Sequence, residues 1–242
     1  MCTRYIPPEV AEIERFWSLP RAHQPDLWPR EIFPRAPGPF IRRRRDATGC
    51  EREMVVGRWG LIPERSETST PRKKDGKLLS TENARGEEVH WKDSYKGPWA
   101  VGQRCIIPAA TFDEPNWETG KNVWWRFRRA DGAPWGLAGL WNAWTDKETG
   151  EMHESYTMLT LHANAHPLMS RMHRPVVDPV TKQSLPLEKQ DKRSVIPLDT
   201  SDFDQWLEGT VEQARALMRL APAEGFDADP MEPTQPSEPE LL

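Results

Sequence analysis

The chain has few cysteines and no long apolar run, and these shortages exclude several classes of protein. Its 242 residues include three cysteines, and no two of them form a CxxC pair. Such a set suits neither a disulfide framework nor a zinc site. No run approaches 18 apolar residues, so the sequence predicts no membrane span. The first residues lack the apolar stretch of a secretory signal, which favours a cytoplasmic protein.

The chain has no overall excess of positive charge, but the two signs of charge are unevenly distributed. The formal net charge is −4, yet residues 223–242 carry six acids and no base, which leaves residues 1–222 with a net charge of +2. Two basic runs stand out there, RRRR at 42–45 and RKK at 72–74. The charge pattern therefore permits a nucleic-acid partner, whose phosphates these arginines would bind, without requiring one.

Tryptophan, by contrast, is abundant. The 12 tryptophans add apolar area to a hydrophobic content of 37%, enough for the core of one large domain or two small ones. Short β-branched and aromatic runs separated by turn residues predict consecutive strands, among them one continuous run over 104–114. The runs at 39–45 and 52–62 predict a hairpin that turns near residues 46–49.

Helices are predicted to be fewer than strands. Apolar spacing predicts helices at 8–18 and 202–219, and Thr81 is a candidate cap for a short helix over 82–90. Proline and acidic residues from 223 onward predict a disordered tail. The sequence therefore indicates a mixed α+β fold, dominated by strands and followed by one tail.

Cys2 is the first candidate for chemistry, because it follows the initiator methionine. Removal of Met1 ahead of a small residue would leave an α-amine and a thiol on adjacent carbons, which together form a reactive 1,2-aminothiol. Cys105 lies in an apolar run and Cys50 in a predicted turn, so both are interpreted as structural. Taken alone, Cys2 can equally be an ordinary second residue.

Two further candidates are a carboxylate and an imidazole. Glu114 lies among aromatic residues, where burial can raise the pKa of a carboxyl group and make it an acid or base. Its neighbours Asp113 and Glu118 are alternatives for that role. His173 lies between two arginines and can exchange protons near neutral pH. His166 is the alternative to His173.

Several sequence blocks occur together in one order, and they carry a resemblance to a known family. The blocks are MC-x-R at the start, RWGLIP at 58–63, NAR at 83–85, RCIIPAATFDE at 104–114, HPLMSRMH at 166–173, KRSVIP at 192–197 and WL at 206–207. In this order they resemble the SRAP family, the SOS-response-associated peptidases, over about residues 2–208. The chain departs from the family pattern at Thr3, where glycine is frequent, at Asp113, in a usual tyrosine position, and in a longer segment after His173.

The resemblance implies both a fold and a function. The fold would be a single strand-rich α+β domain over residues 2–222, with curved antiparallel sheets, a barrel-like core and a few peripheral helices, before a disordered tail at 223–242. The function would be to sense and shield abasic sites in single-stranded DNA. The Cys2 amine would form an imine with the opened sugar, and the thiol would then close a thiazolidine ring.

The resemblance also assigns residues to roles in that chemistry. Catalytic roles fall on Cys2, Asn83, Glu114 and His173. DNA-binding roles fall on Arg4, Trp59, Gly60 and Arg85, where the two arginines would hold phosphates and Trp59 and Gly60 would shape a wall of the site. Trp59 could also serve as a base-stacking surface, but tryptophan in such a run is more often a core residue. No cofactor and no metal is implied. The expected partner is abasic single-stranded DNA, and the protein is expected to be a monomer associated with the nucleoid.

Two other functions are compatible with the same residues. Cys2 could be the nucleophile of an N-terminal-cysteine peptidase or autoprocessing hydrolase, with Glu114 and His173 as base and orienting group. Only Met1 precedes Cys2 in the sequence, which argues against self-processing of a propeptide. Alternatively, the protein could bind single-stranded DNA without covalent chemistry and leave Cys2 idle.

Overall fold

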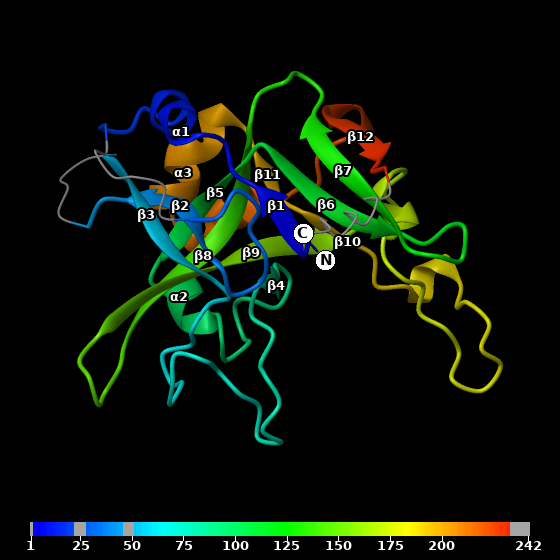
Figure 1. The fold of residues 1–242 in the computed structure, drawn as a ribbon, viewed down its shortest axis with the longest axis horizontal. Coiled ribbons are helices and arrows are strands. Elements are labelled where there is room, and N and C mark those ends of the chain that lie inside the picture. Colours follow the sequence, from blue (N-terminus) through cyan, green and yellow to red (C-terminus); the bar gives the residue numbers. More distant parts are fainter. Residues whose placement is uncertain (1, 22–27, 46–50, 233–242) are drawn as a thin grey trace, which may run out of the picture.

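The computed structural model describes residues 2–21, 28–45 and 51–232, and its centre is a closed five-stranded barrel (Figure 1). The barrel strands are β2 (Pro37–Arg43), β3 (Arg52–Trp59), β5 (Arg104–Ala109), β8 (Trp135–Thr145) and β9 (Met152–His162). Antiparallel pairs join β3 to β2, β2 to β5, β5 to β8 and β8 to β9. A parallel pair between β3 and β9 closes the ring. The predicted barrel-like core is therefore confirmed.

Short strands extend the barrel at two of its members. They are β4 (Asn83–Arg85) and β10 (Arg193–Val195), which pair with β9, and β11 (Pro197–Leu198), which pairs with β8. Because β4 is a strand, the prediction of a helix over 82–90 is wrong. Arg85 lies directly opposite Thr160 in the parallel pairing, so contacts with the barrel outweigh the local signal of a cap at Thr81.

A second sheet packs against the barrel. Its strands, in spatial order, are β1 (Arg4–Ile6), β6 (Thr111–Asn116), β7 (Val123–Arg129) and β12 (Phe226–Pro230). The predicted continuous strand over 104–114 is in fact two strands, β5 in the barrel and β6 in this sheet, with a break at Ala110. That break lets one sequence run link the two sheets.

The C-terminal prediction also needs correction. Residues 226–230 pair with β7 in full antiparallel register instead of belonging to a disordered tail. Phe226 is 8% exposed and packs edge-on against Phe127, so this strand has an apolar anchor that the acidic composition concealed. The rest of the predicted tail, 233–242, and the hairpin turn at 46–49 lie outside the described residues.

The helices are short and peripheral, as predicted (Figure 1). They are α1 (Val10–Phe16), α2 (Lys96–Ala100), α3 (Phe203–Glu208) and α4 (Val211–Ala216), with 3-10 turns at Met169–Arg171, Leu187–Lys189, Thr200–Asp202 and Ala223–Gly225. The predicted helix over 202–219 is divided at Gly209, after which Thr210 and Gln213 form a capping box. Within the described residues, no helix is long and apolar enough to cross a membrane.

Tryptophans and other aromatics form the two hydrophobic clusters that hold these layers. One cluster joins the barrel interior to the second sheet and contains Tyr5, Trp59, Phe112 and Tyr156. The other lies under the helices and includes Trp17, Trp99 and Trp206. Each buried aromatic side chain removes a large apolar area from water, so a chain of modest hydrophobic content still builds a stable core.

Candidate functional site

The start of the chain is fixed beside Glu114 by strand pairing. Arg4 lies opposite Asp113 in the antiparallel pair of β1 and β6, so the residues before Arg4 run alongside Glu114 and Pro115. Cys2 is completely buried there, and its thiol donates to the carbonyl oxygen of Arg4 at 3.3 Å. The second sheet thus places the candidate aminothiol next to the candidate acid–base.

Glu114 and His173 form a buried hydrogen-bonded pair, although they are 59 positions apart in the chain. His173 Nε2 lies 2.8 Å from Glu114 Oε2, and the two side chains are 11% and 1% exposed. The Nδ1 atom of His173 accepts from the backbone N–H of Arg193 at 3.4 Å. With Nδ1 as an acceptor, the proton of the neutral ring belongs on Nε2, which donates to the carboxylate.

The backbone around His173 is unusual and strongly held. Its φ is +63°, a left-handed conformation that costs a non-glycine residue of the order of 1–2 kcal/mol. The backbone N–H of His173 donates to the carbonyl of Pro115 at 2.6 Å, and the Lys192 ammonium donates to the carbonyls of Met172 and His173 at 2.6 and 2.8 Å. These bonds compensate for the strain and aim the ring at Glu114.

The electrostatics of Glu114 differ from the prediction. Burial by itself raises the pKa of Glu114, as the sequence led us to expect, but the N-terminal positive charge and His173 lower it more. The net shift of the pKa is downward, so Glu114 is a carboxylate at neutral pH. It is therefore ready to accept a proton, and it attracts positive charge that develops beside it.

The pKa of the Cys2 thiol shifts in the opposite direction, upward. Burial raises its pKa well above the ordinary value, and the negative charge of Glu114 raises it further. Cys2 is therefore held as a neutral thiol. This state differs from that of a cysteine peptidase nucleophile, whose pKa is lowered by a neighbouring histidine.

Asn83 connects β4 to the start of the chain. Its Nδ2 donates to the backbone carbonyl of Cys2 at 2.8 Å. Its Oδ1 is buried and has no hydrogen-bond partner among the described residues. A buried acceptor without a partner is costly, and it has the capacity to accept a hydrogen bond from an amine or hydroxyl group.

The structure distinguishes the predicted acids and histidines from their alternatives. Asp113 pairs with Arg4 and Arg126, while Glu118 pairs with Arg171. His166 accepts from the backbone N–H groups of two residues that follow it and bonds the Ala221 carbonyl at 2.8 Å, which is a structural role. Only Glu114 and His173 of these candidates contact each other.

Two of the residues expected to bind DNA have other roles in the fold. Trp59 is completely buried, and its indole N–H donates to the Glu82 carbonyl at 2.9 Å, so it is a core residue and the base-stacking alternative is wrong. Gly60 has a φ of +139°, which side-chain-bearing residues rarely adopt, and its N–H donates to the Tyr156 carbonyl at 2.9 Å. Gly60 thus shapes backbone behind the site.

The expected phosphate-binding arginines are mostly engaged in ion pairs. Arg4 contacts Asp113, and Arg85 contacts Glu88 and Asp191. Arg42, in the basic run, is 6% exposed and pairs with Glu53 and Glu154, so it is a structural residue. Arg85 is 44% exposed at its side chain, and exposed pairs are weak, so it can still exchange a carboxylate for a phosphate.

The sequence analysis missed two tryptophan–arginine pairs close to the site. Trp125 lies directly opposite Glu114 in the pairing of β6 and β7, so the two side chains share a face. The guanidinium of Arg171 lies 5.1 Å from the ring centre of Trp125, and that of Arg174 lies 5.3 Å from the ring of Trp117. The doublet Trp124–Trp125 in a predicted strand was the available signal, because one of two neighbours must face Glu114.

The described residues of the site do not form a cluster of metal ligands. Across the described ranges, no three His, Cys, Asp or Glu side chains come together in a group that could hold a metal ion. The site consists of a thiol, a carboxylate–imidazole pair and an amide, which supply nucleophilic and proton-transfer chemistry.

Comparisons with known proteins agree with this fold. The family model described as SOS response associated peptidase (SRAP) matches residues 1–234. A solved structure from Bordetella bronchiseptica is 33% identical, with a TM-score of 0.77 over 96% of this chain and 100% of that one. Another from Bacteroides thetaiotaomicron, 20% identical, shares the fold at a TM-score of 0.70 over 96% of this chain and 92% of its own.

Curated relatives carry the name abasic site processing protein HMCES. The Gallus gallus protein is 29% identical over 155 residues, which are 54% of this chain and 45% of that protein. The Pongo abelii protein is 28% identical over 180 residues, 59% of this chain and 49% of that protein. The chain thus spans about half the length of the curated relatives that it matches.

Proposed function

Because the chain belongs to the SOS response associated peptidase family, we propose that it binds abasic sites in single-stranded DNA and links to them covalently through Cys2. The name of the curated relatives supports abasic DNA as the substrate. The single observation that carries the proposal is the position of Cys2 beside the Glu114–His173 pair, whose partners are 2.8 Å apart.

The proposed reaction needs Cys2 as the first residue, after removal of Met1. The opened sugar of an abasic site is an aldehyde at C1′. The α-amine, with an ordinary pKa of about 7.7–8.0, attacks this carbon and water leaves, which gives an imine. The thiol then adds across the C=N bond, with sulfur on C1′ and the proton on nitrogen. The product is a five-membered thiazolidine, and its closure is fast because both groups are on one residue.

The neighbouring side chains would supply the proton transfers. Glu114, a carboxylate at neutral pH, accepts the proton that the amine loses and stabilises the cationic imine. His173 donates from Nε2 in the present hydrogen bond, and it can pass a proton to the departing water or sugar oxygen. The unpartnered Oδ1 of Asn83 would orient the amine or a sugar hydroxyl.

Single-stranded DNA would lie along the tryptophan–arginine pairs of Trp125 with Arg171 and Trp117 with Arg174. Stacking of a base on an aromatic ring contributes about 1–3 kcal/mol and does not depend on sequence. The two guanidinium groups lie over the rings and can contact phosphates flanking the abasic site. Trp125 shares a face with Glu114, which supports a path for the strand past the reactive carboxylate.

The peptidase alternative receives less support from the same geometry. A cysteine peptidase needs a histidine beside its thiol to lower the thiol pKa. In this protein His173 bonds to Glu114, the Cys2 thiol bonds to the Arg4 carbonyl, and burial raises the pKa of that thiol. Imine chemistry at the amine has no need of a preformed thiolate.

The experiment is a crosslinking assay with single-stranded DNA that contains one abasic site. Wild-type protein should form an adduct that survives denaturing electrophoresis, and Cys2→Ala should form none. Cys50→Ala and Cys105→Ala are matched controls that should retain the adduct. Intact mass of each protein reports removal of Met1 and the added DNA together. Full, stable crosslinking by Cys2→Ala would contradict the proposal.

A further inference from the structure

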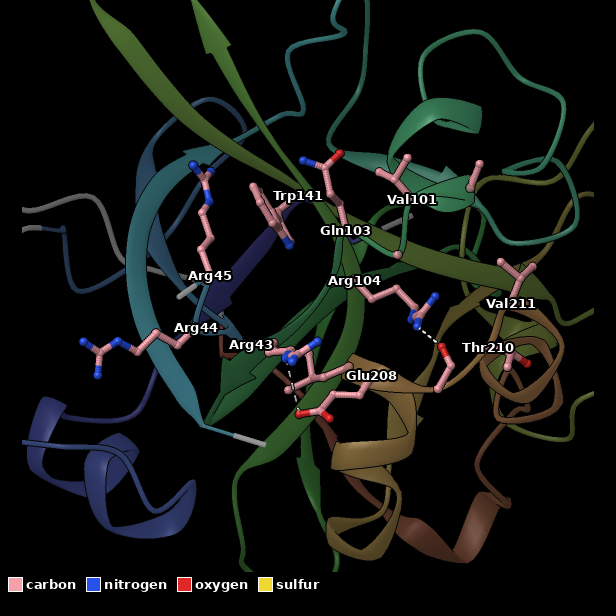
Figure 2. A pocket seen from close by; sticks show the side chains of 14 residues that line it. Arg43, Arg44, Arg45, Val101, Gln103, Arg104, Trp141, Glu208, Thr210 and Val211 are labelled. Atoms are coloured by element: carbon pink, nitrogen blue, oxygen red, sulfur yellow. Dashed lines mark hydrogen bonds and ion pairs between the residues drawn. The ribbon is translucent and has the colours of Figure 1, made fainter. Parts of the chain in front are cut away.

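A polar cavity lies on the barrel, and none of the residues that line it belongs to the candidate site. It has a volume of about 480 Å³. One wall is formed by Arg43, at the end of β2, and by the two arginines that follow it (Figure 2). The other wall combines the segment 100–104 with the turn 207–211 between α3 and α4.

The charges that line this cavity are strongly one-sided. Among the described residues, four arginines line it, together with a single carboxylate, Glu208. The guanidinium of Arg43 lies 3.8 Å from Glu208, and that of Arg44 lies 3.4 Å from Glu51. The Glu208 side chain is 24% exposed, and the other three side chains are about half exposed. Ion pairs of this kind contribute little, so an incoming anion can replace the carboxylates. Arg45 also pairs with Glu154 at 3.1 Å, so the described lining residues carry an excess of positive charge that neighbouring carboxylates partly offset.

Arg104 supplies positive charge from inside the protein. It is 3% exposed, and its guanidinium donates to the backbone carbonyls of Trp206 and Gly209. Among the described residues no carboxylate pairs with it. Carbonyl oxygens satisfy its N–H groups but do not neutralise the charge, so its field reaches the cavity from behind.

The neighbouring aromatic ring orders a third arginine. The Arg45 guanidinium lies 4.8 Å from the ring centre of Trp141, and Arg42 contacts the same ring at 4.2 Å. In Figure 2, the Arg45 side chain rises beside Trp141 at the cavity wall. Stacking restrains a flexible side chain before any ligand binds, which reduces the entropy lost on binding.

We infer that this cavity binds a phosphate monoester, carried by the end of a nucleic-acid strand or by a free nucleotide. A monoester has a charge of about −1.5 to −2 near neutral pH and three terminal oxygens, which suits several converging guanidinium groups. A diester within a strand has a single negative charge and two unbridged oxygens. The concave shape also favours a group that projects from the end of a molecule.

The experiment measures binding to undamaged DNA, so its outcome is independent of the crosslinking reaction. The ligands are one oligonucleotide with a 5′-phosphate, the same oligonucleotide with a 5′-hydroxyl, and a free nucleoside monophosphate. The variants are Arg43→Gln/Arg44→Gln and a control of equal charge change in an exposed loop, Lys73→Gln/Lys74→Gln. Glu208→Gln forms a third variant, because it removes the one carboxylate found among the described residues that line the cavity.

We expect wild-type protein to prefer the 5′-phosphate over the 5′-hydroxyl by about tenfold, as charge-assisted hydrogen bonds predict. The arginine variant should lose this preference, the lysine control should keep it, and Glu208→Gln should strengthen it. Competition by the nucleoside monophosphate at equal affinity would identify a free nucleotide as the ligand, and weak competition would identify a strand end. The inference would be overturned if the protein bound the two oligonucleotides equally and did not bind the monophosphate. It would also be overturned if the arginine and lysine variants lost the same amount of affinity for the 5′-phosphate.

Discussion

Replacement of Glu114 by glutamine separates its chemical role from its structural one. Glutamine has nearly the same shape and keeps an oxygen that accepts the 2.8 Å hydrogen bond of His173. The negative charge is lost. Glu114→Gln should therefore slow crosslinking by about 10²–10⁴-fold, the usual contribution of a positioned general acid–base, while leaving DNA affinity unchanged.

Glu114→Gln should change the stability of the protein only slightly, because Glu114 is buried. A hydrogen bond to a charged group contributes about 1 kcal/mol more than one to a neutral group. Against this loss stands the cost of burying the carboxylate, which is 1% exposed and would no longer be charged. These terms offset each other, so the free energy of unfolding should change by about 1 kcal/mol or less.

Neighbouring carboxylates provide matched controls with opposite expectations. Asp113 is fully buried between Arg4 and Arg126, so Asp113→Asn weakens both contacts and leaves Arg4, among the described residues, only its 3.5 Å ion pair with Glu31. The change should cost about 2–3 kcal/mol. Its crosslinking rate per folded molecule should stay close to that of wild type. Glu118→Gln breaks an exposed pair with Arg171 and should change stability by less than about 1 kcal/mol.

The assay is single-turnover adduct formation between about pH 5 and 9, together with release of a preformed adduct to competing abasic DNA. Because positive neighbours lower the pKa of Glu114, the rate on the acid side should follow deprotonation of the α-amine and not of a carboxyl group. If Glu114→Gln matched wild type in both directions while Asp113→Asn or Glu118→Gln did not, the assignment of Glu114 would be refuted.

Two further predictions concern the stability of the whole domain. Burial raises the pKa of all three tyrosines, so the stability that depends on their protonated form is complete below about pH 10 and is lost as the pH rises further. The ultraviolet absorbance of tyrosinate should appear only with unfolding, and titration of a tyrosine near pH 10 in the folded protein would contradict this. A chain that ends at residue 222 lacks Phe226, and its free energy of unfolding in urea should fall by at least about 3–5 kcal/mol. A chain that ends at residue 232 keeps β12 and should lose little stability. Equal stabilities of the two chains would show that β12 is not needed.

The sequence by itself determined the elements whose signals are local. Alternating β-branched and aromatic residues predicted the hairpin of β2 and β3, and apolar spacing predicted α1. The order of motifs identified the family, and the position of Cys2 suggested the aminothiol chemistry that we propose. These features depend on a few neighbouring residues, or on chemistry within one residue, so they are visible without the fold.

Tertiary structure decided which distant groups meet. Glu114 and His173 are 59 positions apart, and the sequence between them carries no local signal of their contact. That contact depends on the register of β6 and on the strained backbone of His173. Likewise, Trp59 and Trp125 both lie in strand-forming runs, yet one is completely buried and the other lies opposite Glu114. Side chains alternate between the two faces of a strand, but which face borders the core depends on how the barrel and the second sheet pack together.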